Sequence, residues 1–111
     1  MSEPVIIIQT TLPKSWEEFE VGSFSQSLLE AGASCVQHSS ITSMYRWEGE
    51  IESSAEWVLE IKVHSSNKES VISKIEEIHP YDVPQILYWN AMASESYGEW
   101  VRTNSSSHST K

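Results

Sequence analysis

Few side chains in this sequence could bind a metal ion or a small ligand, and they are widely spaced. The stretch "HPYDVP", residues 79–84, holds His79 and Tyr81 between two prolines. Cys35 is the single cysteine, and Lys62 lies in a segment of alternating apolar and polar residues. Thiolate and imidazole are both good ligands for copper. Cys35 and His79 are therefore candidate metal ligands if the fold brings them together.

Each of these residues also has an ordinary structural interpretation. An imidazole and a phenol on a loop, such as His79 and Tyr81, commonly satisfy backbone groups and anchor the loop. A lone cysteine in a strand, such as Cys35, is commonly a small buried apolar residue. Most lysines are solvated or form weak ion pairs, whereas in a cleft Lys62 could meet an anionic ligand. The residue types alone leave both interpretations open.

The sequence contains no preformed metal or catalytic motif. Its histidines form no H-x3-H pair and its one cysteine no CxxC motif, so any metal site must be assembled in space. It has no Gly-rich phosphate loop. A nucleophilic Cys35 with His79 as its base would need positive charge nearby, and this chain offers little. We therefore expect a binding protein and not an enzyme.

Composition limits the expected partners and location. The chain has 111 residues, with 7 Lys and Arg against 16 Asp and Glu, and its net charge of −9 repels nucleic-acid phosphates. No apolar stretch approaches the roughly 20 residues that span a bilayer, and the start lacks the pattern of a signal peptide. We expect a cytoplasmic protein that binds neither nucleic acid nor membranes. Residues 1–103 should form one domain and 104–111 a disordered polar tail.

The first half of the chain predicts a strand, a helix and a second strand. Val5–Thr11 is rich in β-branched residues and favours a buried strand. A capping box of Ser15 and Glu18 should begin the helix, and Gly32 lies where the helix should end. The segment 33–47 is rich in Ser, Thr, Ile, Val and Tyr, which is typical of a long strand, and "WEGE" should turn it.

The second half of the chain predicts another strand, a helix and a final strand. Apolar and polar residues alternate over 57–63, which indicates a strand with one buried face. The stretch "SNKE", residues 66–69, resembles a second capping box, and the helix after it should stop at Ile78 because a proline follows His79. A strand over Gln85–Met92 and a short helix around Trp100 complete the pattern.

The order βαββαβ with a C-terminal helix predicts an α+β, ferredoxin-like sandwich with both helices on one face of an antiparallel sheet; the alternative is an irregular α+β domain.

Strands of about 15 residues reach roughly 50 Å, whereas a helix of about 16 residues covers only ~24 Å. The hairpin should therefore overshoot the helices and expose Tyr45, Trp47 and Trp57. Such a ribbon needs a covering partner, which predicts a homo-oligomer.

The segments "SMYRWEGEIE", "EIKV", "HPYDVP" and the cysteine in "GASCV" together resemble the CutA family of divalent-cation tolerance proteins. The similarity runs from "IIIQTTLP" to "YGEWV". The resemblance implies a ferredoxin-like homotrimer, similar in assembly to the PII signalling proteins. It also implies a role in tolerance to copper and other divalent metals, by binding such ions. The alternative is a PII-like small-molecule sensor that acts through a protein partner.

The resemblance further implies where a site would lie. Cys35 and His79, the candidate metal ligands, would lie at the boundary between subunits. A cleft between subunits would be lined by Tyr45, Trp47, Glu56, Lys62, Tyr81, Gln85 and Trp100. The sequence departs from the family at Thr10, often a cysteine, at Gln85, commonly a glutamate, and at Ala31–Gly32, where a basic residue is common. These departures reduce the number of groups that could bind a metal.

Overall fold

The computed structural model describes residues 4–105. None of the helices in this range is both long and apolar enough to cross a membrane. The elements in chain order are β1 (Val5–Pro13), α1 (Glu18–Glu30), β2 (Cys35–Trp47), β3 (Glu50–Val63), the 3-10 turn η1 (Ser65–Asn67), α2 (Lys68–Ile78), β4 (Leu87–Ala91) and α3 (Glu95–Thr103).

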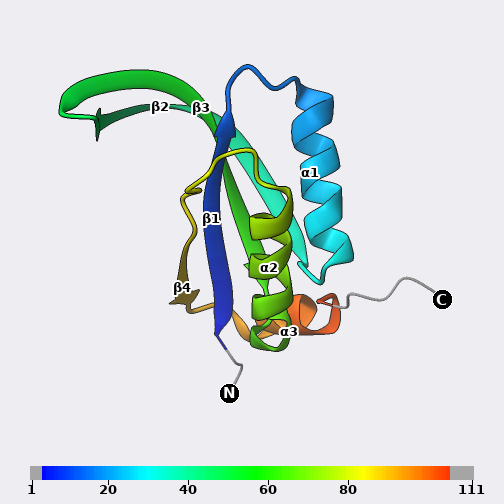
Figure 1. Cartoon of the computed structure of the whole chain (residues 1–111). Helices are drawn as coiled ribbons and strands as arrows, with labels where there is room; N and C mark the ends of the chain where they lie inside the picture. Colours follow the sequence, from blue (N-terminus) through cyan, green and yellow to red (C-terminus); the bar gives the residue numbers. More distant parts are fainter. Residues whose placement is uncertain (1–3, 106–111) are drawn as a thin grey trace.

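The four strands form one antiparallel sheet in the order β2-β3-β1-β4. Helices α1 and α2 lie side by side on one face of this sheet (Figure 1). The predicted ferredoxin-like α+β sandwich is therefore confirmed, including the short C-terminal helix. The last strand is shorter than expected, because it begins at Leu87 and not at Gln85.

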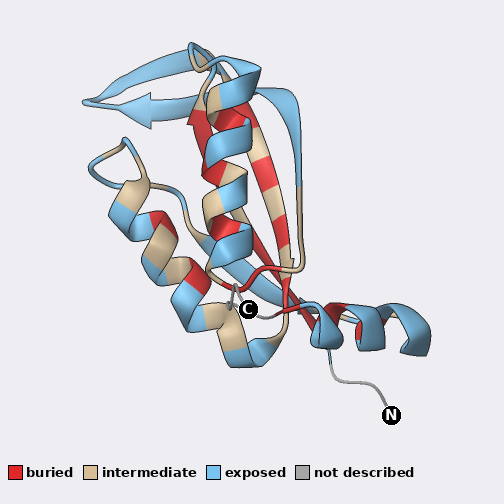
Figure 2. Cartoon of the chain, turned by 90° about the vertical axis from the view of Figure 1, so that its right-hand side faces the viewer, coloured by how far each residue is buried: buried red, intermediate tan, exposed pale blue. Residues whose placement is uncertain are grey.

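The main core lies between the sheet and the two helices. Alternate residues of β3 from Trp57 to Val63 are buried there, as their period of two predicts. They pack against one face of β1 and one face of each helix (Figure 2). The fully buried members include Ile8, Leu12, Val21, Leu28, Leu59, Ile61, Val71 and Ile75.

Both helix starts differ from the predicted capping boxes. Helix α1 is capped by Glu17, whose backbone N–H donates to Glu20 Oε1 at 2.8 Å. The predicted box with Ser15 fails because the chain first makes a tight turn, in which Trp16 N donates to Pro13 O at 3.0 Å. The start of α2 differs because the "SNKE" segment begins as the turn η1, and its N-cap residue Asn67 makes no side-chain capping bond.

Helix α3 covers one end of the other sheet face. Its Val101 packs against Val5 and Ile7 of β1. Ser34 Oγ and Ser105 Oγ both donate to the Val101 carbonyl at 2.8 Å, so this helix end is tied to the sheet. Ser105 is thus a buried part of the fold, although the sequence places it in the polar tail; residues 106–111 lie outside the described range.

The β2–β3 hairpin extends well beyond the helices and curves away from them (Figure 1). Its turn is made by Glu48 and Gly49, both with positive φ, 52° and 82°, which suits the right-handed twist of the two strands. The longest dimension of the chain is 47 Å against 21 Å for the shortest. The predicted overshoot is confirmed, with Met44, Tyr45, Trp47 and Ile51 exposed on the projecting part. The prediction that Trp57 is exposed there is wrong, because Trp57 lies where the helices still cover β3 and is buried in the main core.

Two neighbouring leucines of α1 test the position of the core. Leu28 is fully buried and Leu29 is 41% exposed. We expect Leu28→Ala to lower the free energy of unfolding by about 3 kcal/mol, because it leaves a cavity. Leu29→Ala should cost below about 1 kcal/mol. Urea unfolding at one fixed protein concentration measures both, and equal losses would contradict this core assignment.

Candidate functional site

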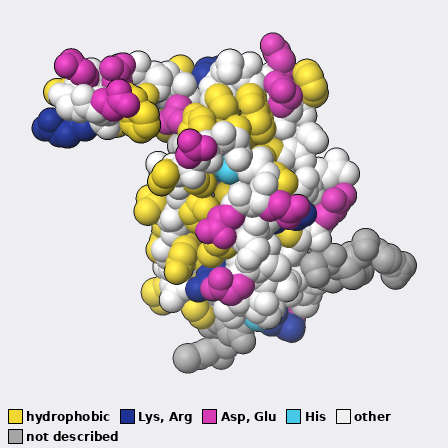
Figure 3. Space-filling model, viewed as in Figure 1, with side chains coloured by type: hydrophobic (Ala, Val, Ile, Leu, Met, Phe, Trp, Pro, Cys, Tyr) yellow, Lys and Arg dark blue, Asp and Glu magenta, His cyan; other side chains and the backbone are white. Residues whose placement is uncertain are grey.

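A cleft of about 740 Å³ lies between the projecting hairpin and the loop 79–86 that joins α2 to β4. We call it the hairpin cleft. In the space-filling view, the hairpin projects from the body and carries both carboxylates and hydrophobic side chains (Figure 3). The lining residues come from β1, β2, β3 and the loop: Thr11, Ser43, Met44, Tyr45, Trp47, Glu52, Ser54, Glu56, Tyr81, Asp82, Val83 and Gln85.

Strand pairing positions the hairpin wall of the cleft. Tyr45 and Trp47 are two residues apart and so lie on the same face of β2. The register places Tyr45 opposite Glu52, which therefore shares that face. The Tyr45 hydroxyl lies 3.3 Å from Ser54 Oγ, a hydrogen bond that holds the ring in place. The turn at Glu48 and Gly49 fixes this register, because a two-residue loop allows no slip.

The opposite wall is the "HPYDVP" loop, and His79 anchors it. Helix α2 ends at Ile78, and His79 is extended, as expected before a proline. His79 Nε2 donates to the Thr11 carbonyl at 2.7 Å, and its Nδ1 accepts from Tyr81 N at 3.1 Å. The ring also makes edge contacts with Phe24 in the core. His79 therefore has the loop-anchoring role that was one of its two interpretations.

The hydrogen bonds of His79 require a neutral imidazole. Nε2 must carry a proton for the carbonyl, and Nδ1 must be free of one to accept from Tyr81 N. Burial lowers the pKa of His79 below its ordinary value of 6.5, against the opposing effects of the Thr11 bond and the Glu56 charge. The two observations agree: the fold favours the uncharged ring.

Glu56 joins the two walls of the cleft. Its carboxylate accepts from Ser43 Oγ at 2.7 Å and from the Tyr81 hydroxyl at 3.1 Å. Burial, together with the bond to Glu56 and its charge and a smaller contribution from Tyr45, raises the pKa of Tyr81 to about 12. The phenol therefore stays protonated well into the alkaline range and remains a donor to Glu56.

The structure brings together five of the sequence-predicted site residues and leaves three elsewhere. The cleft is lined by Tyr45, Trp47, Glu56, Tyr81 and Gln85, with His79 behind it. Lys62 instead bonds the Gln37 side chain on the open face of the sheet. Trp100 lies on α3, where it stacks on Tyr97 with ring centroids 5.8 Å apart.

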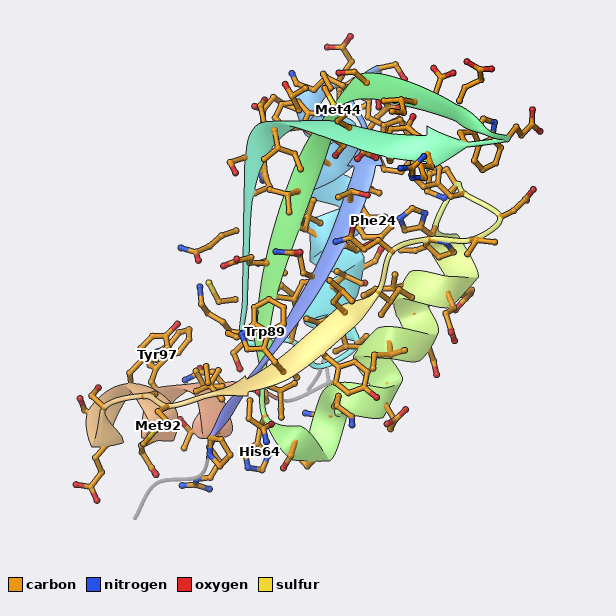
Figure 4. The ribbon with its side chains drawn as sticks, turned by 90° about the vertical axis from the view of Figure 1, so that its left-hand side faces the viewer. Phe24, Met44, His64, Trp89, Met92 and Tyr97 are labelled. Atoms are coloured by element: carbon orange, nitrogen blue, oxygen red, sulfur yellow. The ribbon has the colours of Figure 1, made fainter. Side chains whose placement is uncertain are left out.

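Cys35 and His79 do not meet within one chain. Cys35 is paired with Lys62, which is paired with Ile7, whereas His79 bonds Thr11, four residues further along β1. Four residues of a strand span about 13 Å. Cys35 is instead near Tyr97, whose pKa is raised by burial and by that thiol. Figure 4 shows Tyr97 at the opposite end of the sheet from Met44 on the hairpin.

Sequence reasoning missed several residues that line the cleft. Ser43 could have been predicted, because it lies two residues before Tyr45 and so on the same face of the strand. Glu52 and Ser54 could have been predicted from the pairing that a turn at "WEGE" imposes on the two strands. Nothing in the sequence indicates that Thr11, at the end of β1, reaches this wall. Within residues 4–105 no three His, Cys, Asp or Glu side chains are grouped so that they could hold a metal ion.

The neutral His79 predicts a loss of stability in mild acid. Because its folded pKa is lowered, its contribution to stability is complete above about 6.5 and is lost as pH falls from there through the folded pKa. The variant His79→Gln can still donate to Thr11 but does not titrate, so its unfolding free energy should depend less on pH between 7.5 and 5.5. Urea unfolding at both pH values tests this. Identical pH slopes for both proteins would refute it, as would an imidazole NMR titration of His79 at or above pKa 6.5.

The chain resembles known proteins over nearly its whole length. The family model described as "CutA1 divalent ion tolerance protein" matches residues 6–104. The divalent-cation tolerance protein CutA of Pyrococcus horikoshii is 34% identical over 100 residues, which cover 87% of this chain and 94% of that protein. Protein CutA, chloroplastic, of Arabidopsis thaliana is 31% identical, over 91% of this chain and 56% of that protein.

Solved structures agree with these relatives. The structure of CutA from Synechococcus elongatus PCC7942 superposes with a TM-score of 0.84 at 28% identity, covering 96% of this chain and 95% of that one. The PII-like protein CutA from Nostoc sp. PCC 7120 gives 0.79 at 25% identity, covering 93% and 99%. Sequence and fold thus agree, and the chain belongs to the CutA family of divalent-cation tolerance proteins.

Proposed function

We propose that this protein is a homotrimeric, non-enzymatic binding module for divalent-cation tolerance, with the hairpin cleft as its ligand site. The observation that carries the proposal is the cleft itself, which gathers five family-implied residues from β2, β3 and the loop 79–86. Its volume of about 740 Å³ lies within the range of small-molecule sites. The proposal keeps the cytoplasmic location expected from the sequence, although two relatives are named chloroplastic and another periplasmic.

The exposed hairpin supports assembly into an oligomer. Met44 and Ile51 are 74% and 66% exposed. The outer edges of β2 and β4 pair with no strand among the described residues. Exposed apolar side chains on a long hairpin, together with an open strand edge, invite pairing with another chain. Further copies of this chain would cover it, and the number three comes from the family resemblance.

A copper site would have to be built between subunits. Cys35 and His79 remain the candidate ligands, because a thiolate and an imidazole suit copper. His79 would have to give up its bond from the Tyr81 amide, so that its Nδ1 could bind the ion. Since they lie apart in one chain, Cys35 of one copy would have to meet His79 of another. A divalent ion other than copper would have to find carboxylate or imidazole ligands in the same way.

A second function is favoured by the size and lining of the cleft. A PII-like sensor would bind a small molecule there and transmit the change to a protein partner through the projecting hairpin. The Nostoc relative is described as PII-like. This function requires a small organic ligand, whereas the first requires a metal ion.

We expect a solution mass of three chains of 12.6 kDa by light scattering at micromolar concentration. Ile51→Glu, which puts a charge on the projecting hairpin, should lower this mass. Phe19→Glu, which changes a residue 75% exposed on α1, should leave it unchanged. A folded wild-type monomer would contradict the trimer.

Copper titration of the reduced protein by calorimetry tests the metal site. We expect saturable Cu(I) binding at an integer number of sites per trimer. Cys35→Ser should abolish tight binding while leaving the mass unchanged, because the hydroxyl is a poor ligand for Cu(I). Unchanged affinity would remove Cys35 from the site. An intact trimer that binds no copper would refute direct metal binding and leave the small-molecule function.

A further inference from the structure

The hairpin cleft carries negative charge without any positive charge. Glu52, Glu56 and Asp82 line it, and none of its lining residues is Lys, Arg or His. Within residues 4–105 the side-chain carboxylates of Glu52 and Asp82 make no hydrogen bond or ion pair. The whole chain has a net charge of −9, which adds to the same field. An anionic ligand would be repelled, and a cation would be attracted.

Aromatic rings form part of both walls of the same cleft. Trp47 and Tyr45 are 62% and 43% exposed on the hairpin wall, and Tyr81 lies on the loop wall. Exposed aromatic faces attract organic cations through the ring quadrupole, and Trp does so most strongly. The bond between Tyr45 and Ser54 holds one ring in place before any ligand arrives. Rings and carboxylates in one hollow favour a ligand that has both charge and apolar surface.

Glu56 is oriented to receive such a ligand. Ser43 and Tyr81 each donate one hydrogen bond to a different oxygen of its carboxylate. A carboxylate has about four acceptor positions, so lone pairs remain for an ammonium or guanidinium group. A phenol is protonated at neutral pH, so the bond from Tyr81 to Glu56 persists there. The charge at the inner end of the cleft is thus fixed in place.

The size of the cleft favours an organic cation over a metal ion. A volume of about 740 Å³ is far larger than one ion and its ligands need. No three carboxylate, imidazole or thiol groups of residues 4–105 converge to coordinate one. We propose that the hairpin cleft binds a small organic cation through a substituted ammonium or guanidinium group. This inference deepens the proposed function, because it names the ligand class of that cleft.

Choline and its neutral isostere 3,3-dimethylbutan-1-ol provide the direct test, because they share a shape and differ in charge. The indole N–H signal of Trp47 in a ¹H–¹⁵N spectrum, assigned with Trp47→Phe, reports on the cleft of the intact oligomer. Choline should shift this signal saturably, and the neutral isostere should not. Agmatine, which carries a guanidinium group, shows which of the two cationic groups binds more tightly.

Variants separate the aromatic and charge contributions. By calorimetry, Trp47→Leu should weaken binding of the preferred cation about tenfold, and Trp47→Phe should weaken it less because a ring remains. Glu52→Gln should weaken binding about fivefold. Glu76→Gln, the same change at an exposed site on α2 outside the cleft, should have no effect. Light scattering confirms that each variant keeps its mass.

Three results would overturn the inference. Equal binding of choline and its neutral isostere would remove the role of charge, and tighter binding of citrate would reverse its sign; either leaves the cleft as a ligand site and so spares the proposed function. A trimer that binds none of these probes, with the Trp47 indole shielded from solvent, would mean that a neighbouring subunit fills the cleft. That outcome would refute both the cation and the cleft as ligand site.

Discussion

The pairing of β2 with β3 continues past the point where the helices end, and the rest of the structure depends on this. In the part of the hairpin far from its turn, helices α1 and α2 cover alternate residues of β3 and form the core with them. In the part near the turn the same two strands have no helix beside them (Figure 1). That free length forms one wall of the hairpin cleft, and it also leaves apolar surface for another chain to cover. The cleft and the tendency to assemble thus have one structural cause.

The cleft exists only because a loop is fixed against the free hairpin. Two prolines stiffen residues 79–84, but stiffness does not decide where a loop lies. His79 does so by bonding the Thr11 carbonyl of β1 and the Tyr81 amide at once. Tyr81 then bonds Glu56 of β3. One neutral imidazole and one protonated phenol therefore position the second wall, so protonation of the first should loosen it.

Much of the fold could be predicted, because it follows from local patterns. The period of two in β3, the proline after His79 and the two-residue turn at Gly49 each act over a few residues and were recognisable. The helix starts were not, because Ser15 and Glu18 match a capping box that the preceding turn prevents. Five site residues were placed through the family resemblance. Thr11 was missed because its position depends on contact with a loop almost 70 residues away.

The departures from the family pattern have different consequences in this fold. Thr10 is fully buried on the helix side of β1, opposite Leu59, and its hydroxyl finds no partner among the described residues. A thiol at that position would face the core and could not reach the hairpin cleft. Gln85 does line the cleft, where its side chain donates to Gln9 at 3.1 Å. Of these two departures only the one at Gln85 alters the cleft. It puts a neutral amide where the family resemblance implies a carboxylate, and the remaining carboxylates must then provide the attraction for a cation.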